Sequence, residues 1–319
     1  MWRVLVHANR GDHALSFDVT LDGRTCQLHA MTPLSWSLID HLLMTWRAHL
    51  SLNYTLERER SVARFQHEGP LRILQSLYPE GDAICHNVLV HPPGGFVGGD
   101  VMDIQIAVSS QAHGLITTPG ATRYYRSEQG AATNAVQARL EDASRLEWLP
   151  LESLAYPGCD ALNRMEFHLS PSAELMAWDV TALGLDQANA PFASGRYLQH
   201  IEIPGVWLER GMIDAQDDRL MNSPLALAGH RCIATLLFAA GSPLQASRAE
   251  AALEAARALI DDSPLKAQAG VTLAHPQVLT LRVLTPMVEP AMRLLRPVWA
   301  AWRRTLWQLP GQPPRLWNL

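Results

Sequence analysis

The sequence lacks the features of nucleic-acid-binding, membrane-spanning or secreted proteins. Among 319 residues, acidic side chains outnumber basic ones by 31 to 26, so there is no excess of positive charge for binding a phosphate backbone. No apolar run approaches the roughly 20 residues that a membrane-spanning helix needs, and the first residues do not resemble a signal peptide. The four cysteines, Cys26, Cys85, Cys159 and Cys232, are widely dispersed, which argues against a disulfide framework. We therefore expect a cytoplasmic protein with reduced thiols that binds neither nucleic acid nor a membrane.

Common catalytic and nucleotide-binding motifs are also missing. The segment His91–Asp100, HPPGGFVGGD, is rich in glycine, and Gly94 and Gly99 have the spacing of a P-loop. Asp100 stands where that motif needs lysine, and a carboxylate there would repel a phosphate. The chain contains no G-x-G-x-x-G, G-x-S-x-G, H-E-x-x-H or C-x-x-C motif. We interpret the loop as a shaped backbone in which glycines allow positive φ or close packing.

The patterns that are present are mostly those of β-strands. Val101–Val108 alternates strictly, with Met102 and Ile104 on one face and Asp103 and Gln105 on the other. Many similar short segments follow, often separated by Gly, Pro, Asn or Asp. This spacing predicts stacked or sandwiched antiparallel sheets, not a βαβ series.

Two helices are predicted near the C-terminus. In the first, residues 242–260, Ser242 is the expected N-cap, Pro243 the first helical residue and Gln245 the partner in a capping box. The second spans residues 289–307, and Pro297 should kink it or mark a restart. One face of this second helix carries Leu295, Trp299, Trp302 and Leu306. Such a stripe is either part of the core or, at Trp299, Trp302 and Leu306, a surface for docking a partner.

No compact metal-binding motif is visible. Cys85 and His86 are adjacent on a predicted strand and therefore point to opposite faces. Any metal site would have to be assembled from distant residues. Carboxylates suit a weak route for a hard cation better than a tight thiolate site. The candidates for such a route are Asp100, Asp103, Glu152 and His86.

Several long motifs resemble one known family. In order, they are His67–Gly81 (HEGPLRILQSLYPEG), Cys85–Asp100 (CHNVLVHPPGGFVGGD), Thr117–Ser127 (TTPGATRYYRS), Leu146–Glu152 (LEWLPLE), Leu208–Gly211 (LERG), Leu281–Leu284 (LRVL) and Pro313–Leu319 (PPRLWNL). Their order and spacing resemble those of the urease accessory proteins of the UreD (also UreH) family. The resemblance covers residues 46–319, and residues 1–45 form an extension outside the family pattern.

The residues that carry this resemblance are called the signature residues below. They are Gly69, Pro70, Pro79, Glu80, Gly81, Cys85, His86, His91, Pro92, Pro93, Gly94, Gly95, Gly98, Gly99, Asp100, Thr118, Pro119, Gly120, Ala121, Tyr125, Arg126, Glu147, Trp148, Pro150 and Trp317.

The resemblance implies one large, mostly β domain with a few helices and no enzymatic activity of its own. Members of the family bind the urease apoprotein and recruit the helical protein UreF and, through it, the GTPase UreG, so that nickel reaches the urease active site. Two such UreD–UreF–UreG heterotrimers can form a dimer. No tightly bound cofactor is expected, only nickel in transit, and a water-filled tunnel is the proposed nickel route in the family.

Two other functions remain open from the residues alone. One is a metal-dependent hydrolase on a β scaffold, with Asp100, Glu152 and a histidine at its centre, although no recognised spacing supports it. The other is a nickel-storage protein, which should show a concentrated cluster of histidine and cysteine.

Overall fold

The computed structural model describes residues 6–11, 14–21, 24–29 and 46–318, which divide into two compact units, Met1–Thr45 and Trp46–Leu319. In the first unit, β1 (Val6–Gly11), β2 (Ala14–Leu21) and β3 (Arg24–His29) form an antiparallel sheet in that order. The rest of the predicted extension, including residues 30–45, lies outside the described residues.

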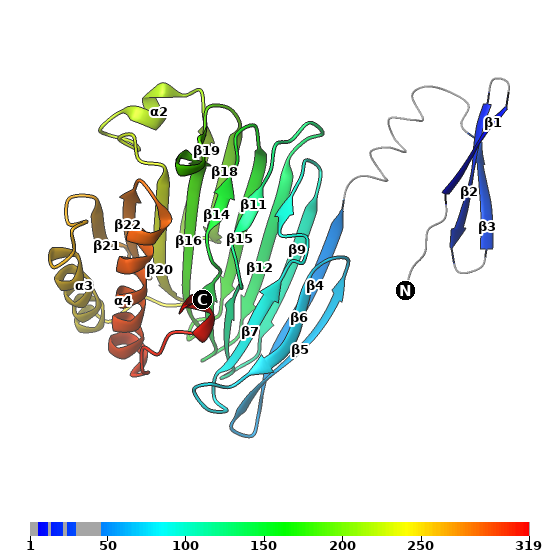
Figure 1. The fold of residues 1–319 in the computed structure, drawn as a ribbon. Helices are drawn as coiled ribbons and strands as arrows, with labels where there is room; N and C mark the ends of the chain where they lie inside the picture. Colours follow the sequence, from blue (N-terminus) through cyan, green and yellow to red (C-terminus); the bar gives the residue numbers. More distant parts are fainter. Residues whose placement is uncertain (1–5, 12–13, 22–23, 30–45, 319) are drawn as a thin grey trace. The chain divides into compact units, whose positions relative to one another are not determined.

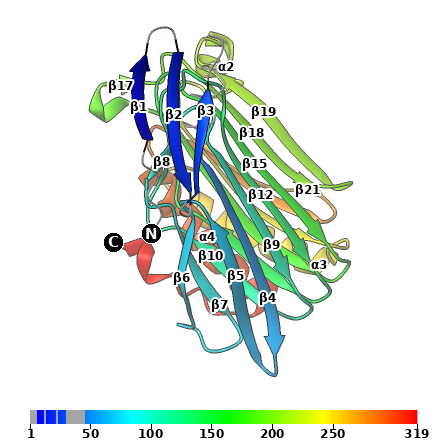
Figure 2. The ribbon, with the colours of Figure 1, turned by 90° about the vertical axis from the view of Figure 1, so that its right-hand side faces the viewer.

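The second unit is built from two stacked sheets (Figure 1). The smaller sheet has seven strands in the order β19-β18-β15-β12-β9-β4-β5, and Figure 2 shows them side by side. Their bounds are β4 (Arg47–Glu57), β5 (Arg60–Glu68), β9 (Val101–Val108), β12 (Ala132–Leu140), β15 (Asp160–Leu169), β18 (Arg196–Ile203) and β19 (Trp207–Asp214).

The larger sheet has twelve strands, with the main order β21-β22-β20-β16-β13-β10-β7-β6 and four short strands beside this path. The strands of the main path are β6 (Arg72–Leu77), β7 (Cys85–Val90), β10 (His113–Thr117), β13 (Arg145–Leu149), β16 (Glu174–Leu185), β20 (Cys232–Ala240), β21 (Ala269–His275) and β22 (Val278–Thr285). The short strands are β8 (Gly95–Phe96), β11 (Thr122–Tyr124), β14 (Ser153–Ala155) and β17 (Ala190–Pro191).

The chain passes alternately through the two sheets. Each new central strand lies parallel to the strand that the previous turn of the chain placed in the same sheet. In the smaller sheet β4, β9, β12, β15 and β18 are successive parallel neighbours, and in the larger sheet β7, β10, β13 and β16 are. The predicted mostly β fold of stacked sheets is confirmed. The predicted antiparallel pairing is wrong at the centre and holds only towards the edges, because successive strands lie in different sheets and cannot pair as hairpins.

Alternation of apolar and polar residues produces the core between the sheets. Met102, Ile104, Ile106 and Val108 of β9 are all buried there, as the sequence predicts, while Asp103 points to the other face and is only half-buried. A second apolar core lies on the opposite face of the larger sheet, beneath two helices. The larger sheet therefore has apolar residues on both faces.

The two predicted helices are present as α3 (Ala246–Asp261) and α4 (Val288–Trp307), and they cover the larger sheet (Figure 1). The predicted capping box is wrong: α3 begins with Gln245 as an extended N-cap that makes no side-chain cap hydrogen bond. The Leu244 amide donates instead to the Pro276 carbonyl, which holds the chain extended up to the helix. The helix α4 runs through Pro297 without a restart.

The aromatic stripe of α4 lies in the core. Trp299, Trp302 and Leu306 are at most 5% exposed because this face packs on the larger sheet and on α3. The prediction that they form an exposed docking surface is therefore wrong, and the core alternative holds. The remaining helical turns are α2 (Asp218–Asn222), η1 (Asp186–Ala188) and η2 (Arg315–Asn318). Of the helices in the described part of the chain, none is long and apolar enough to cross a membrane.

Candidate functional site

Three loops of the larger sheet lie side by side. Each interrupts the passage from a long strand to a short one: residues 91–94 between β7 and β8, residues 118–121 between β10 and β11, and residues 150–152 between β13 and β14. Because β7, β10 and β13 are parallel and in register, their loops leave the sheet at the same level. The motifs HPPGG, TTPGA and LPLE are thereby brought together.

These loops line a cavity of about 230 Å³ between the two sheets. The smaller sheet contributes inward-facing side chains from β9, β12 and β15, and the larger sheet contributes side chains from β7, β13 and β16. Eight signature residues are among those that line it: His91, Gly94, Thr118, Pro119, Gly120, Ala121, Trp148 and Pro150. The glycine-rich loop is therefore a wall of a cavity.

A buried carboxylate forms the polar part of the cavity. Asp179 of β16 accepts hydrogen bonds from Asn163 Nδ2 and Gln199 Nε2, both at 2.8 Å, and from Thr181 Oγ1 at 3.1 Å. Asn134 extends the cluster, because its Nδ2 donates to Asn163 Oδ1 at 3.0 Å. All three donors to Asp179 are neutral. Burial therefore raises the pKa of Asp179 to about 6, and the hydrogen bonds only partly oppose that rise.

The rest of the lining is less polar. Met102 and Met165 bring thioethers to the cavity, and the indole Nε1 of Trp148 has no hydrogen-bond partner among the described residues. His91 stacks on Phe96 at a centroid distance of 5.1 Å, and burial lowers the pKa of its imidazole. The cavity thus combines one carboxylate, amides, hydroxyls and soft sulfur atoms with a neutral imidazole and the guanidinium of Arg123.

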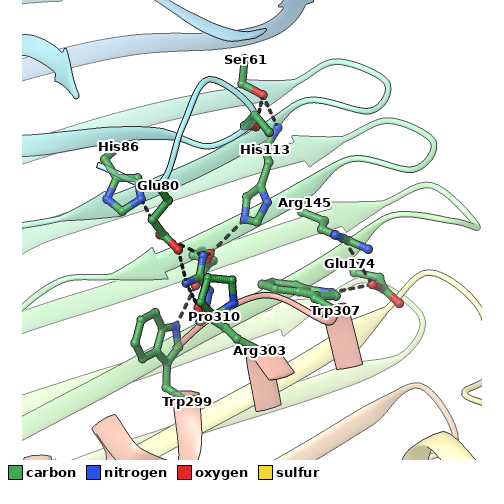
Figure 3. Close-up of polar contacts among 12 residues, drawn as sticks. Ser61, Glu80, His86, His113, Arg145, Glu174, Trp299, Arg303, Trp307 and Pro310 are labelled. Atoms are coloured by element: carbon green, nitrogen blue, oxygen red, sulfur yellow. Dashed lines mark hydrogen bonds and ion pairs between the residues drawn. The ribbon is translucent and has the colours of Figure 1, made fainter. Parts of the chain in front are cut away.

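A second buried cluster lies on the opposite face of the larger sheet, where α4 covers it (Figure 3). Arg303 of α4 donates to both oxygens of Glu80, at 2.7 and 3.1 Å, and its Nη2 lies 3.2 Å from Glu147 Oε1. The Arg303 side chain is fully buried, as is that of Glu147. We call Glu80, Glu147 and Arg303, with the histidines that contact them, the ion network.

Two histidines and a tryptophan complete the ion network. His113 Nε2 is 2.9 Å from Glu147 Oε1, His86 Nε2 is 2.9 Å from Glu80 Oε1, and Trp299 Nε1 donates to Glu147 Oε2 at 2.7 Å (Figure 3). Burial alone would raise the pKa of Glu147, but His113 and the Arg303 charge outweigh it and hold that pKa below its usual range. Burial lowers the pKa of His113, so its imidazole is neutral beside an ionised Glu147.

The four predicted metal-route residues do not converge. Asp100 caps its own loop: Oδ1 accepts from the Trp46 amide at 2.9 Å and Oδ2 from the Val97 amide at 3.0 Å. Asp103 lies on the outer face of the smaller sheet and contacts His49 at 2.9 Å.

The other two predicted residues lie elsewhere. His86 belongs to the ion network, and Glu152 is in the loop after β13. Within residues 46–318 and the described part of the first unit, no three His, Cys, Asp or Glu side chains are placed to hold a metal ion.

The glycines of the loop serve the shape of the backbone, as predicted. Gly94 and Gly99 have φ of 76° and 86°, which side chains rarely adopt. Gly95 and Gly98 instead allow close approach: a Cβ on Gly98 would lie 2.1 Å from Ser127 Oγ and 2.8 Å from the Gly130 carbonyl oxygen. The glycines therefore act through backbone conformation and close packing.

Sequence reasoning missed the central residues of both clusters. Asp179 stands alone as a charge in the apolar strand LMAWDVTALGL, and that isolation was a usable signal. Arg303 follows Trp302 in α4 and is buried with the apolar residues of that helix. The helical period alone does not distinguish a buried arginine from an exposed one at this position. Neither pattern reveals the partners, which come from distant strands.

Comparison with known proteins gives the family. A model of the UreD urease accessory proteins matches residues 47–318. The chain belongs to this family. The urease accessory protein UreD of Variovorax paradoxus is 61% identical over 274 residues, which cover 86% of this chain and 99% of the relative. The UreD proteins of Paracidovorax citrulli and Methylibium petroleiphilum are 61% and 47% identical, each over 86% of this chain and all of the relative. Membership of the UreD family implies a role in urease maturation.

Proposed function

We propose that this UreD-family chain is a non-catalytic scaffold for nickel insertion into urease, acting in the cytoplasm. It binds the urease apoprotein and recruits UreF and, through UreF, the GTPase UreG, and two such heterotrimers form a dimer. The family match over residues 47–318 supports a maturation role. The names of the relatives, all accessory proteins, support a role without catalysis of its own. Nickel is cargo in this proposal and not a resident cofactor.

We further propose that nickel passes through the inter-sheet cavity. The observation that carries this step is the position of Asp179 among neutral donors in a cavity lined by eight signature residues. A buried carboxylate without a cationic partner favours either a proton or a passing cation. Amide oxygens and thioethers bind a divalent cation weakly, which allows it to leave again.

The scaffold role is tested by co-expression with the urease subunits. Urease made with this chain should contain nickel and be active, and urease made without it should contain little nickel. The chain should also co-purify with the urease apoprotein and with UreF. Fully nickel-loaded urease in the absence of the chain would contradict the proposal.

The conduit is tested by changing the cavity without changing the surface. Asn134→Leu removes a polar group from the lining at similar volume, and Asn53→Leu is the matched control on an exposed strand position. We expect Asn134→Leu to lower the nickel content of urease while the complex with urease persists, and Asn53→Leu to change neither. Equal nickel contents for the two variants would contradict the route through the cavity.

The hydrolase and storage alternatives are not favoured by any specific observation in the described residues.

A further inference from the structure

The larger sheet is interrupted beside the cavity. The last paired residues of β13 and β16 are Trp148 and Ala177, and pairing resumes only at Ser153 of β14 and Thr181 of β16. Between these points a side chain replaces the backbone ladder: Trp178 Nε1 donates to the Pro150 carbonyl at 2.5 Å. Pro150 lines the cavity, so this indole closes the wall where strand pairing is absent.

Trp317 covers this interruption from the helical side. Its ring lies 4.7 Å from that of Trp178 and 5.0 Å from that of Trp299, measured between centroids. Its Nε1 donates to Thr117 Oγ1 at 3.0 Å, and the side chain is only 4% exposed. Thr117 immediately precedes Thr118, another residue of the cavity wall. Trp317 therefore contacts Trp178, which binds the loop of residues 150–152, and Thr117, which precedes the loop of residues 118–121.

The segment that carries Trp317 has few attachments of its own. We call residues 308–318, which follow α4, the C-terminal strap. Pro314 and Trp317 are buried, whereas Gln308, Pro310, Gln312, Pro313 and Arg315 are exposed. Arg303 Nη1 binds the Pro310 carbonyl at 2.5 Å and so fixes the start of the strap to the ion network. Beyond Pro310, the strap is held mainly by Pro314 and by Trp317, whose ring centroid also lies 5.6 Å from the guanidinium carbon of Arg296.

We propose that Trp317 is the lid residue of the inter-sheet cavity: when it is seated, it holds the Trp178 indole across the gap between β13 and β14, and when it withdraws, Trp178 loses this packing partner and the cavity opens towards the helical side. The physical basis is that the wall at this point consists of two indoles in tilted contact, with no backbone ladder between β16 and the strands β13 and β14. Hydrogen-bonded strands separate only by local unfolding, whereas a single side chain on an exposed strap leaves its site without disturbing either sheet. Control of nickel passage by this lid rests on the proposed function, but the opening itself does not.

Oxidation of methionines by hydrogen peroxide, mapped by mass spectrometry on the full chain, tests the lid. Met102 and Met165 line the cavity, Met221 is equally buried outside it, and Met176 lies in the core beneath the helices. We expect Trp317→Ala to speed oxidation of Met102 and Met165 several-fold and to leave Met221 and Met176 unchanged. Trp317→Phe, which keeps the aromatic contacts but loses the hydrogen bond to Thr117, should give an intermediate rate.

Trp302→Phe is the matched control in the same apolar layer. It removes the hydrogen bond from Trp302 Nε1 to the Ala252 carbonyl, which ties α4 to α3 and does not contact the cavity loops. This variant should leave oxidation of Met102 and Met165 at the wild-type rate. If Trp317→Ala accelerates all four methionines equally, Trp317 only stabilises the fold and the lid is overturned. Unchanged oxidation of Met102 and Met165 in Trp317→Ala overturns it as well.

The nickel content of urease made with the same variants separates the lid from the conduit. Faster oxidation of Met102 and Met165 with altered nickel loading supports both. Faster oxidation with unchanged nickel loading supports the lid and contradicts nickel passage through this cavity.

Discussion

Two carboxylates on neighbouring strands of the larger sheet are buried on opposite faces and behave in opposite ways. Asp179 of β16 faces the cavity, and Glu147 of β13 faces the ion network. Both are nearly inaccessible, with exposed fractions of 7% and 0%. The pKa of Asp179 is nevertheless raised to about 6, whereas the pKa of Glu147 is lowered. Burial alone does not decide the charge of a buried acid; here the hydrogen bond from His113 and the nearby Arg303 charge lower the pKa of Glu147, and Asp179 has no such cation beside it among the described residues.

The two faces of the larger sheet therefore have different roles: one anchors the helices, and the other holds a carboxylate without a cationic partner in the described part of the chain. Arg303 and its carboxylates tie residues of α4, β13 and the segment before β7 into one unit, which fixes the helical layer. Asp179 has only neutral donors, so its charge weakens the fold at neutral pH and remains available to a proton or a cation. The predictions below test this contrast, from the largest expected effect to the smallest.

The largest effect is expected from removing the cation of the ion network. Arg303→Met leaves two buried carboxylates without their guanidinium partner and should lower the free energy of unfolding by about 3–5 kcal/mol. Urea unfolding at pH 7 measures it. Arg304→Met, at the exposed neighbouring position, is the control and should change stability by less than about 0.5 kcal/mol. Similar losses for the two variants would show that the network does not stabilise α4.

The Asp179 side should show a pH dependence of known sign. Its pKa is about 6 in the folded chain and about 3.9 unfolded, so the protonated group stabilises the fold below about pH 4, and that contribution is lost as the pH rises through 6. The total is about 3 kcal/mol, from about 1.4 kcal/mol per pKa unit. Asp179→Asn has no such titration. Its free energy of unfolding, minus that of the wild type, should therefore rise by about 2 kcal/mol between pH 4 and pH 7, most of the total.

The contribution of Glu147 to the free energy of unfolding changes with pH in the opposite direction, and over a lower range of pH. Because its folded pKa is depressed, its contribution is present above its unfolded pKa and is lost as the pH falls through the folded value. For Asp179, the contradicting result is a stability difference between Asp179→Asn and the wild type that does not change from pH 4 to 7. That result would mean that Asp179 has a cationic partner in solution.

The glycine-rich segment His91–Asp100 should depend on shape instead of charge. Gly98→Val places side-chain atoms against Ser127 and the Gly130 carbonyl and should cost about 1–3 kcal/mol by overpacking. Thermal unfolding measures this loss. Gly120→Val, in the next loop, is the control, since a Cβ there meets no atom within 4 Å. Equal destabilisation by both would refute close approach as the reason for glycine at position 98.

The smallest effect is expected at Asp103, a carboxylate that shares neither environment. It pairs with His49 on the outer face, where the two side chains are about 40% exposed. Asp103→Asn should change the free energy of unfolding by less than about 1 kcal/mol, because exposed pairs contribute little. Measured between pH 4 and 7, it is also the control for Asp179→Asn. A loss comparable to that of Arg303→Met would show that exposure does not separate these groups.

Much of the architecture was predictable from local pattern. Strict alternation in Val101–Val108 predicts a half-buried strand, and Trp299, Trp302 and Leu306 share one helical face, because these periods are properties of the backbone itself. The glycines of HPPGGFVGGD predict a shaped loop because glycine adopts backbone conformations that other residues rarely do. The direction of pairing was not predictable, since an alternating strand has the same pattern beside a parallel or an antiparallel neighbour.

By itself, the sequence determined the strands, the helical faces, the loop and, through its long motifs, the family. Only the tertiary structure decided where the polar side chains meet. Glu80 and Arg303 are 223 residues apart, and Trp299 is 152 residues from Glu147. Asp179 finds its donors on other strands, Asn163 on β15 and Gln199 on β18. A local pattern specifies which face of an element is apolar, but the partner of a buried charge, and therefore its pKa and its role, depends on which elements the winding of the chain stacks against it.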